Sequence, residues 1–241
     1  MKLLTIQNQK TIKGEAKGYL TGILYLDPRQ KNICPKATPG CKQGCLFTAG
    51  RGAFTTVQNA RMKKTHWYKE DLQGFMAQLV QDIEALERQA KRKGLIPCVR
   101  INGTSDINWI TEYLSVKLEN FGWTNPKWNI FKAFPHIQFY DYTKRLDILD
   151  NARTISNYHV TFSRSERNEH DLQYVRPDEN IAVVFDQLPT QYHGRQVISG
   201  DDHDLRFTDP PGVIVGLIPK GKAKKDNTGF TVQTLTQIER N

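Results

Sequence analysis

Three cysteines lie close together in the chain and are its strongest chemical signal. Cys34, Cys41 and Cys45 have the spacing C-x6-C-x3-C, in the segment CPKATPGCKQGC. Its prolines and glycines restrict the loop or permit left-handed backbone, which lets a short chain turn three sulfurs toward one point. The alternative is three unliganded thiols, but a loop rich in Pro, Gly and Lys offers little apolar surface to bury them. We expect a metal site.

Two kinds of metal site suit this loop. An iron–sulfur cluster, most simply 4Fe–4S, could use the three cysteines and leave one iron open to a cofactor or substrate. A closed zinc site would need a fourth ligand, which His66 or Cys98 could supply. Cys98 lies in an apolar run, however, and is expected in the core. The iron–sulfur reading is favoured, and zinc stays open.

Charge and composition point to the partner and the compartment. The net charge is +9, which favours a polyanionic partner, a nucleotide or nucleic acid, over mere solubility. No stretch reaches the roughly 18 apolar residues that a membrane span needs. The start of the chain does not read as a secretory signal, and clustered reduced thiols suit the cytoplasm. We therefore expect a cytoplasmic protein without a membrane partner, and the oligomeric state stays open.

Apolar runs alternate with helical patterns along the whole chain. Such alternation predicts parallel strands in a single α/β domain over residues 1–241, with the cysteine loop at 34–45. We expect a complete or partial (β/α) barrel, TIM-like, with a doubly wound open sheet as the alternative. Helices are expected over 54–93 and 110–121, and strands over 18–26, 96–101, 136–140, 158–162, 180–185 and 212–218.

Polar residues follow two of these strands as candidate cofactor ligands. After the strand at 96–101, a ribose or an amino-acid headgroup could bind to Asn102, Thr104, Ser105 and Asp106, although Ser105 or Asp106 could merely cap the next helix. After the strand at 158–162, the composition of a ribose or carboxylate clamp is found in Ser163, Arg164 and Glu166.

Three further strand-end residues are candidate catalytic groups. Asp141 and Lys144 set a carboxylate beside a cation and could face substrate, with a surface ion pair as the alternative. Asp186 is a candidate general acid or base, with turn capping as the alternative. Because parallel strands end at one edge of a sheet, we expect these residues to share a pocket.

Two basic segments could contact phosphates. The segment Arg61–Tyr68 interleaves cations with Trp67 and Tyr68, as single-strand binding surfaces do, although both aromatic residues could equally be core. The segment 220–225 carries four lysines after the last strand, and it is either a phosphate-contacting loop or a solvated one.

The cysteine loop resembles that of radical S-adenosylmethionine enzymes. In those enzymes three cysteines after the first strand of a (β/α) barrel hold a 4Fe–4S cluster whose open iron binds S-adenosylmethionine. Their usual spacing is C-x3-C-x2-C with an aromatic residue before the last cysteine, where this chain has the longer spacing and Gly44. The resemblance implies the same cluster at Cys34, Cys41 and Cys45, with S-adenosylmethionine as a possible cofactor.

Nearly the whole chain is similar to the phage and plasmid "gene product 88" type of protein. The similarity is carried by 34–35, 39–41, 45–46, 50–52, 100–106, 139–144, 161–163 and 215–217. This resemblance implies a phage or plasmid setting and hence the host cytoplasm.

These observations give three expected functions. The first is an iron–sulfur enzyme, radical-SAM-like, acting on a nucleotide or nucleic acid. The second is a zinc-containing barrel that exchanges or cleaves a base, as transglycosylases do, with Asp106 or Asp186 as nucleophile or base. The third is a non-catalytic nucleic-acid-binding or host-interfering protein in which a metal only fixes a loop.

Overall fold

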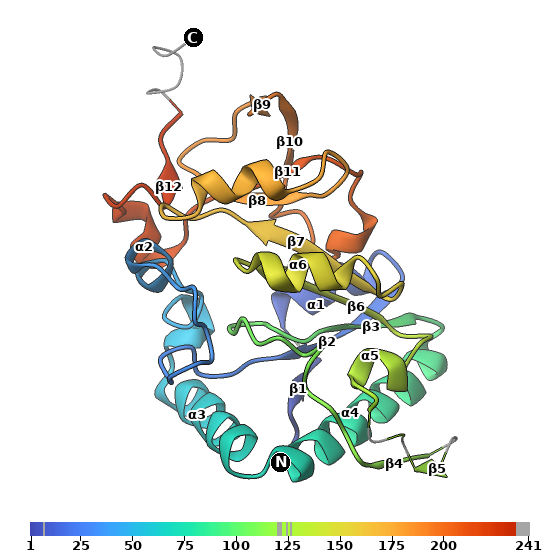
Figure 1. Cartoon of the computed structure of the whole chain (residues 1–241). Coiled ribbons are helices and arrows are strands. Elements are labelled where there is room, and N and C mark those ends of the chain that lie inside the picture. Colours follow the sequence, from blue (N-terminus) through green and yellow to red (C-terminus); the bar gives the residue numbers. More distant parts are fainter. Residues whose placement is uncertain (7, 120–121, 124, 126, 235–241) are drawn as a thin grey trace.

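One large, mostly parallel sheet forms the centre of the molecule (Figure 1). The computed structural model describes residues 1–6, 8–119, 122–123, 125 and 127–234. From one edge to the other, the strands are β1 (Leu4–Thr5), β2 (Tyr19–Leu24), β3 (Ile96–Arg100), β6 (Gln138–Thr143), β7 (Tyr158–Ser163), β8 (Ile181–Phe185), β11 (Ile214–Leu217), β10 (Arg195–Ser199) and β9 (Gln191–Tyr192). The pairs from β2 to β10 are parallel, and both edge strands are antiparallel to their neighbours.

The α/β class and the six predicted strands are confirmed. β2, β3, β6, β7 and β8 lie side by side in chain order, and β9, β10 and β11 follow in reverse order, with β11 next to β8. In the described part of the chain β1 and β9 do not pair, so no closed barrel is found. Because the parallel strands share one direction, the segments after β2, β3, β6, β7 and β8 all emerge at the same carboxyl edge.

Helices and short elements fill the connections. The helices are α1 (Gln9–Glu15), α2 (Pro39–Gln43), α3 (Thr55–Glu70), α4 (Leu72–Lys93), α5 (Ile130–Ala133) and α6 (Leu146–Ala152). The 3-10 turns are η1 (Gly50–Ala53), η2 (Glu169–Tyr174), η3 (Arg206–Thr208) and η4 (Gly221–Lys225). β4 (Lys117–Leu118) and β5 (Gly122–Trp123) pair antiparallel, and β12 (Thr231–Val232) pairs in parallel with the end of β8.

The long helical pattern over 54–93 is confirmed, with a break at Asp71. The Asp71 side chain accepts a hydrogen bond from Gly74 N at 2.9 Å and so caps a new helix, α4. An apolar stripe of α4, which includes Phe75 and Leu79, is fully buried. Gly94 ends the helix in the left-handed conformation, at φ 66°.

The predicted helix over 110–121 is wrong. Within the described residues of this segment, Leu114, Val116 and Leu118 are buried while the residues between them are exposed. Burial with a period of two is the pattern of an extended chain, not of a helix. The backbone N–H of Leu114 donates to Trp128 O at 2.9 Å, and β4 follows.

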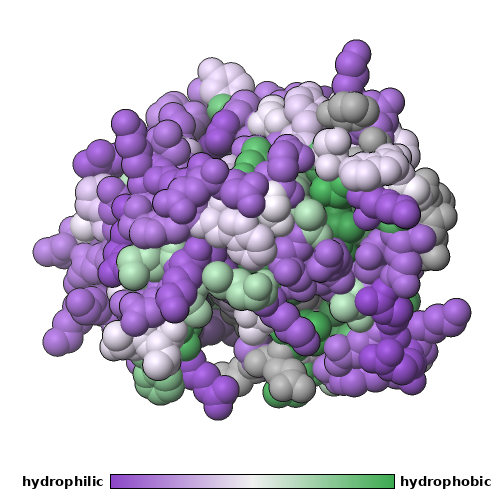
Figure 2. Space-filling view, turned by 90° about the horizontal axis from the view of Figure 1, so that it is seen from below, coloured by the Kyte–Doolittle hydropathy of each residue, from purple (hydrophilic) through white to green (hydrophobic). Residues whose placement is uncertain are grey.

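The two faces of the sheet differ in chemistry. The main apolar core lies on one face, where residues from α4, α5 and α6 pack against side chains such as Val99 and Phe139. The other face carries Cys98 and Tyr140 beneath Leu205. Hydrophilic residues cover most of the surface that Figure 2 shows. None of the described helices is long and apolar enough to cross a membrane.

Candidate functional site

The cysteine loop follows β2 and is ordered by a short helix. Thr38 caps α2, because its hydroxyl accepts a hydrogen bond from Cys41 N at 3.3 Å, and Pro39 occupies the first turn, where no N–H is needed. Cys34, Cys41 and Cys45 are all partly exposed. The three thiols are therefore neither core residues nor fully solvated.

Glu166, which follows β7, holds this loop in place. One carboxylate oxygen accepts from Thr38 Oγ1 at 2.7 Å, and the other accepts from Gly40 N at 2.8 Å. The sequence marked Glu166 as part of a ribose or carboxylate clamp, whereas the structure assigns its carboxylate to the start of α2. In this arrangement Glu166 is a positioning residue for the cysteines.

Replacing Glu166 by alanine should lower the free energy of unfolding by about 2 kcal/mol, since two charge-assisted hydrogen bonds are lost from a half-buried site. Urea unfolding measures this loss, and limited proteolysis should show faster cleavage within residues 34–53. Arg167→Ala, an exposed neighbour, is the matched control and should change little. Equal stability of the two variants would contradict the assignment.

The C-terminal segment also packs against the loop (Figure 1). A Cβ atom at Gly40 would lie 2.2 Å from Thr228 Oγ1 and 2.4 Å from Phe230 Cβ, so only glycine fits there. At Gly44 the nearest atom would be Ala223 Cβ, at 3.0 Å. Residues far apart in the sequence thus enclose α2.

Lys144, at the end of β6, is the charged group that the cysteines share. Its Nζ donates to Ser163 Oγ at 3.0 Å. Burial alone would lower the pKa of Lys144, but the acidic groups around it, foremost Cys41, Asp106 and Cys34, raise it above its usual value. Lys144, Ser163 and the cysteine loop are therefore neighbours in the structure.

Asp106, next to this lysine, connects three chain segments by hydrogen bonds. Its carboxylate accepts from Thr143 Oγ1 at 2.6 Å and from Lys144 N at 3.1 Å, and its own N–H donates to Ile33 O at 2.8 Å. Burial raises the pKa of Asp106, and the two hydrogen bonds oppose that rise. No helix begins directly after Asp106, and the next one in the described chain is α5 at Ile130, so helix capping by Ser105 or Asp106 is wrong.

The environment of the thiols disfavours their ionised form. Burial, together with the neighbouring acidic groups Asp106 and Cys41, raises the pKa of Cys34 to about 12. Burial also raises the pKa of Cys45. Without an added cation, both are neutral thiols at neutral pH and poor nucleophiles.

The three thiols of the loop suit a metal by their chemistry but not by their arrangement. Three partly exposed thiols on one loop are the ligand type of an iron–sulfur cluster. Among the described residues, however, no group of three or more His, Cys, Asp or Glu side chains is arranged to hold a metal ion. The two candidate fourth ligands for zinc lie elsewhere: His66 is exposed on α3, and Cys98 is buried in β3 with its sulfur 3.3 Å from Thr21 Oγ1.

Asp141 and Asn102 form a buried network rather than an open part of the site. Asp141 is 0% exposed, and its carboxylate accepts from Asn102 N at 2.7 Å and Tyr158 OH at 3.2 Å. The Asn102 side-chain oxygen in turn accepts from Ser105 Oγ at 2.7 Å. Asp141 does not face solvent, so a surface ion pair at this position is wrong. The buried Thr104 hydroxyl donates to the main chain, at Leu26 O.

Arg164 and Asp186 hold the C-terminal segment. Arg164 donates to Glu169 and to Phe230 O, the latter at 3.1 Å. Asp186 accepts from Thr234 N at 3.0 Å. Burial opposes the ionised form of Asp186, but hydrogen bonds from Thr234 hold its pKa below the usual value. A carboxylate of lowered pKa is a poor proton donor at neutral pH.

The predicted single-strand surface on α3 is wrong for its aromatic residues. Trp67 and Tyr68 pack edge-on against Phe75, with ring centroids 5.9 and 5.5 Å away, so the core alternative is confirmed. Arg61, at the start of the same predicted phosphate-contacting segment, is 8% exposed and so does not lie on an open surface. Its burial beside Tyr25 and Phe47 had no local signal in the sequence.

The fold and site define an α/β protein whose cysteine loop lies at the carboxyl edge of a mostly parallel sheet. A family model described as "Gene product 88" matches residues 1–234, and the chain belongs to that family. Searches of curated proteins and of solved structures found no match.

Proposed function

We propose that this protein is an iron–sulfur enzyme that acts on a nucleotide or nucleic acid. The observation that carries the proposal is that Cys34, Cys41 and Cys45 belong to one loop and interact electrostatically with one another and with Lys144 at the carboxyl edge of the sheet. A cluster would have to draw the three thiols closer together than they lie in the described structure. That edge is where α/β sheets place their active sites. Glu166 and Asp106 hold the loop and the lysine there.

The cysteines would hold the cluster, and the cluster would supply redox chemistry and an open iron for a cofactor such as S-adenosylmethionine. Metal binding deprotonates thiols outright and so compensates the burial that keeps Cys34 and Cys45 neutral. Lys144 would keep a positive charge beside the thiolates. Ser163, which accepts the hydrogen bond from Lys144, would fix the position of that charge.

The strand order supports a partial barrel as the finer description of the fold. Five parallel strands follow each other in chain order, and α4, α5 and α6 contribute to the core on one face of the sheet. A doubly wound sheet would instead reverse its strand order near the centre. A partial barrel encloses its site at the carboxyl edge, which suits the position of the cysteine loop.

Exposed cations surround the cysteine loop and support a polyanionic partner. On the loop side they are Lys31, Lys36, Lys42 and Arg51, and on η4 they are Lys222, Lys224 and Lys225. η4 contacts α2, so the two groups form one basic rim. Phosphates attracted to this rim would be guided toward the thiols.

Neutralising the η4 part of this rim should weaken nucleic-acid binding several-fold. In the triple variant Lys222→Gln, Lys224→Gln, Lys225→Gln, the slope of log affinity against log salt should fall by about 2 to 3, as three phosphate contacts are lost. Fluorescence anisotropy with labelled single-stranded DNA and RNA over a salt series measures both changes.

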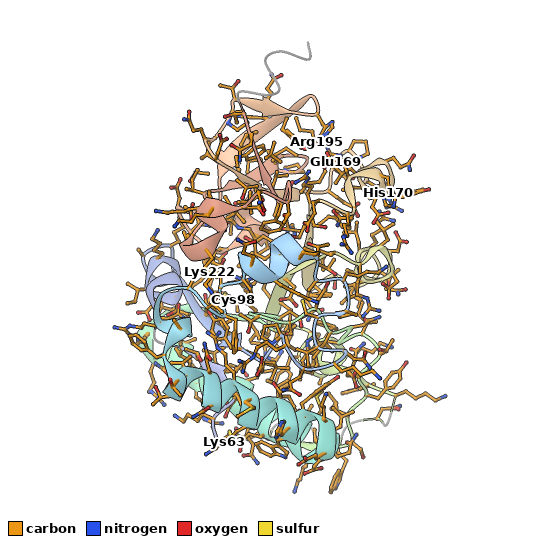
Figure 3. All side chains as sticks on the ribbon, turned by 90° about the vertical axis from the view of Figure 1, so that its left-hand side faces the viewer. Lys63, Cys98, Glu169, His170, Arg195 and Lys222 are labelled. Carbon is orange, nitrogen blue, oxygen red and sulfur yellow. The ribbon has the colours of Figure 1, made fainter. Side chains whose placement is uncertain are left out.

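The matched control removes three exposed cations elsewhere, in Lys63→Gln, Lys91→Gln, Arg92→Gln. Figure 3 shows Lys63 well apart from Lys222, and Lys91 and Arg92 end α4 on the opposite side of the molecule from α2 (Figure 1). Equal weakening by both triple variants would show diffuse attraction and would remove the basic rim from the proposal.

Element analysis of protein purified without oxygen tests the metal. We expect bound iron and sulfide, and visible charge-transfer absorption after anaerobic reconstitution. Zinc in place of iron, with no absorption, would overturn the iron–sulfur proposal and favour the base-exchanging alternative. Neither metal, together with intact nucleic-acid binding, would favour a non-catalytic binding protein.

A further inference from the structure

We propose that Arg61 is a phosphate-binding residue beside the cysteine loop, the contact for an anionic group of the nucleotide or nucleic-acid ligand. Arg61 is 8% exposed, and two of its guanidinium nitrogens, Nε and Nη1, have no hydrogen-bond partner among the described residues. Buried polar groups are nearly always satisfied, and buried cations almost never lack a partner. Donors left open in this way indicate an acceptor that arrives with a ligand.

Two aromatic rings hold the guanidinium rigidly. The central carbon of Arg61 lies 4.7 Å from the centroid of the Tyr25 ring and 5.4 Å from that of Phe47. Rings stabilise a cation through their faces but accept none of its in-plane hydrogen bonds. The N–H groups of Arg61 are therefore fixed in direction and left without acceptors, which favours a planar, directional contact with an oxyanion.

The carboxylate that acts electrostatically on Arg61, that of Asp27, is already engaged. It accepts hydrogen bonds from the backbone N–H and the guanidinium of Arg29, the shortest from Nη2 at 2.8 Å. The Arg29 guanidinium itself lies 4.5 Å from the centroid of the Phe47 ring. Asp27 thus forms its pair with Arg29, and Arg61 has no such pair in the described chain.

The location of Arg61 connects it with the cysteine loop. Cys45 and Asp27 are among the groups that act electrostatically on Arg61, and Arg61 acts in turn on Cys45. A phosphate bound here would lie next to the thiols and inside the rim of exposed cations. That rim favours a phosphate over a lone carboxylate, because several cations attract a polyanion more strongly than a single charge.

The inference rests on the nucleotide or nucleic-acid partner of the proposed function, but it does not need the metal. A buried charge without a partner destabilises the ligand-free fold, and an apolar side chain of similar volume removes that cost. A residue that binds ligand at the expense of stability can therefore be recognised by two effects of its replacement. Its replacement leaves the free protein as stable as before or more so, and abolishes stabilisation by the ligand.

The test compares thermal unfolding of wild type, Arg61→Met and Arg61→Lys, each alone and with inorganic phosphate, adenosine 5′-monophosphate or adenosine. We expect phosphate and the monophosphate to raise the melting temperature of wild type, whereas adenosine does not. Arg61→Met should melt at or above wild type without additives and should lose the shift. Arg61→Lys should keep part of the shift, because it retains the charge without the guanidinium fork. Lys63→Met, an exposed cation on the same helix, is the control and should keep the full shift.

Three results would overturn the proposal: no phosphate-dependent shift in wild type, an unchanged shift in Arg61→Met, or a strongly lowered melting temperature of Arg61→Met with the shift retained. The last would make Arg61 a structural cation. The metal proposal fails separately, because a phosphate shift that persists in protein without iron leaves this site in place.

Discussion

Replacing Asp141 by alanine should lower the free energy of unfolding by about 3 kcal/mol, since it leaves buried hydrogen-bond donors without an acceptor. Asp141 accepts from Asn102 N and Nδ2 and from Tyr158 OH. Asn102 in turn organises the whole turn after β3, through Ser105 and Trp109. The substitution should therefore loosen the support beneath Lys144 as well as the core.

Urea unfolding at neutral pH measures this loss. The matched control is Asp150→Ala, which removes an exposed carboxylate paired with Arg153 at the surface. Such pairs contribute about 0 to 1 kcal/mol, so the control should stay close to wild type. A similar small loss in both variants would show that the buried network contributes little.

The ionisation of Asp141 should also make the free energy of unfolding depend on pH, and the sign of this dependence follows from the pKa. Burial raises the pKa of Asp141 to about 8, although the Asn102 N–H, Arg100 and Tyr158 oppose the rise. In the unfolded chain the pKa is about 4. A pKa raised by folding means that the folded state binds the proton more tightly, so this stabilisation is complete below about pH 4 and is lost as the pH rises toward 8.

The side chain at this position cannot ionise in Asp141→Asn. Comparing this variant with wild type therefore isolates the contribution of Asp141 ionisation to the free energy of unfolding. The stability of wild type relative to Asp141→Asn should fall between about pH 4 and pH 8, and should level off above that range. Chemical unfolding of both proteins over a pH series measures it. Parallel pH profiles would show that the carboxyl group keeps one protonation state throughout.

The sequence located the parallel strands because buried strands of such sheets are continuous apolar runs. β10 was not predicted, because Arg195–Ser199 has no apolar run and lies near the edge of the sheet. The helix predicted over 110–121 failed for another reason. Its apolar residues also fit a period of two, and contacts with Trp128 selected the extended form.

The sequence predicted which residues lie near the carboxyl edge of the sheet, but not where their side chains point. Asp141 lies within β6 rather than after it, so the pleat of the strand turns its side chain into the helix-covered core. Lys144, just beyond the strand, reaches the cysteines instead. Glu166 and Arg164, which were predicted to bind a ligand, also bind the chain itself, at Gly40 in α2 and at Phe230 just before β12. Such long-range partners have no local signal in the sequence.

Replacing Cys34, Cys41 or Cys45 by serine should abolish most of the iron binding and the visible absorption of the reconstituted protein. A serine hydroxyl is nearly isosteric with the thiol but does not ionise at neutral pH, and a cluster ligand must be deprotonated. Metal analysis and absorption spectra after identical anaerobic reconstitution measure the loss. Because all three side chains are partly exposed, the serine variants should fold, and urea unfolding of the metal-free proteins checks this.

Cys98→Ser is the matched control for this experiment. Cys98 is buried in β3, with its sulfur 3.3 Å from Thr21 Oγ1, and it belongs to the apolar cluster with Tyr140. The substitution should change stability without changing iron content, since a serine hydroxyl can still bond Thr21. Loss of iron in Cys98→Ser, or its retention in all three loop variants, would move the metal away from the cysteine loop. Loss of iron in the three loop variants alone would show that the cluster binds at the cysteine loop beside Lys144, next to the site that we assign to phosphate.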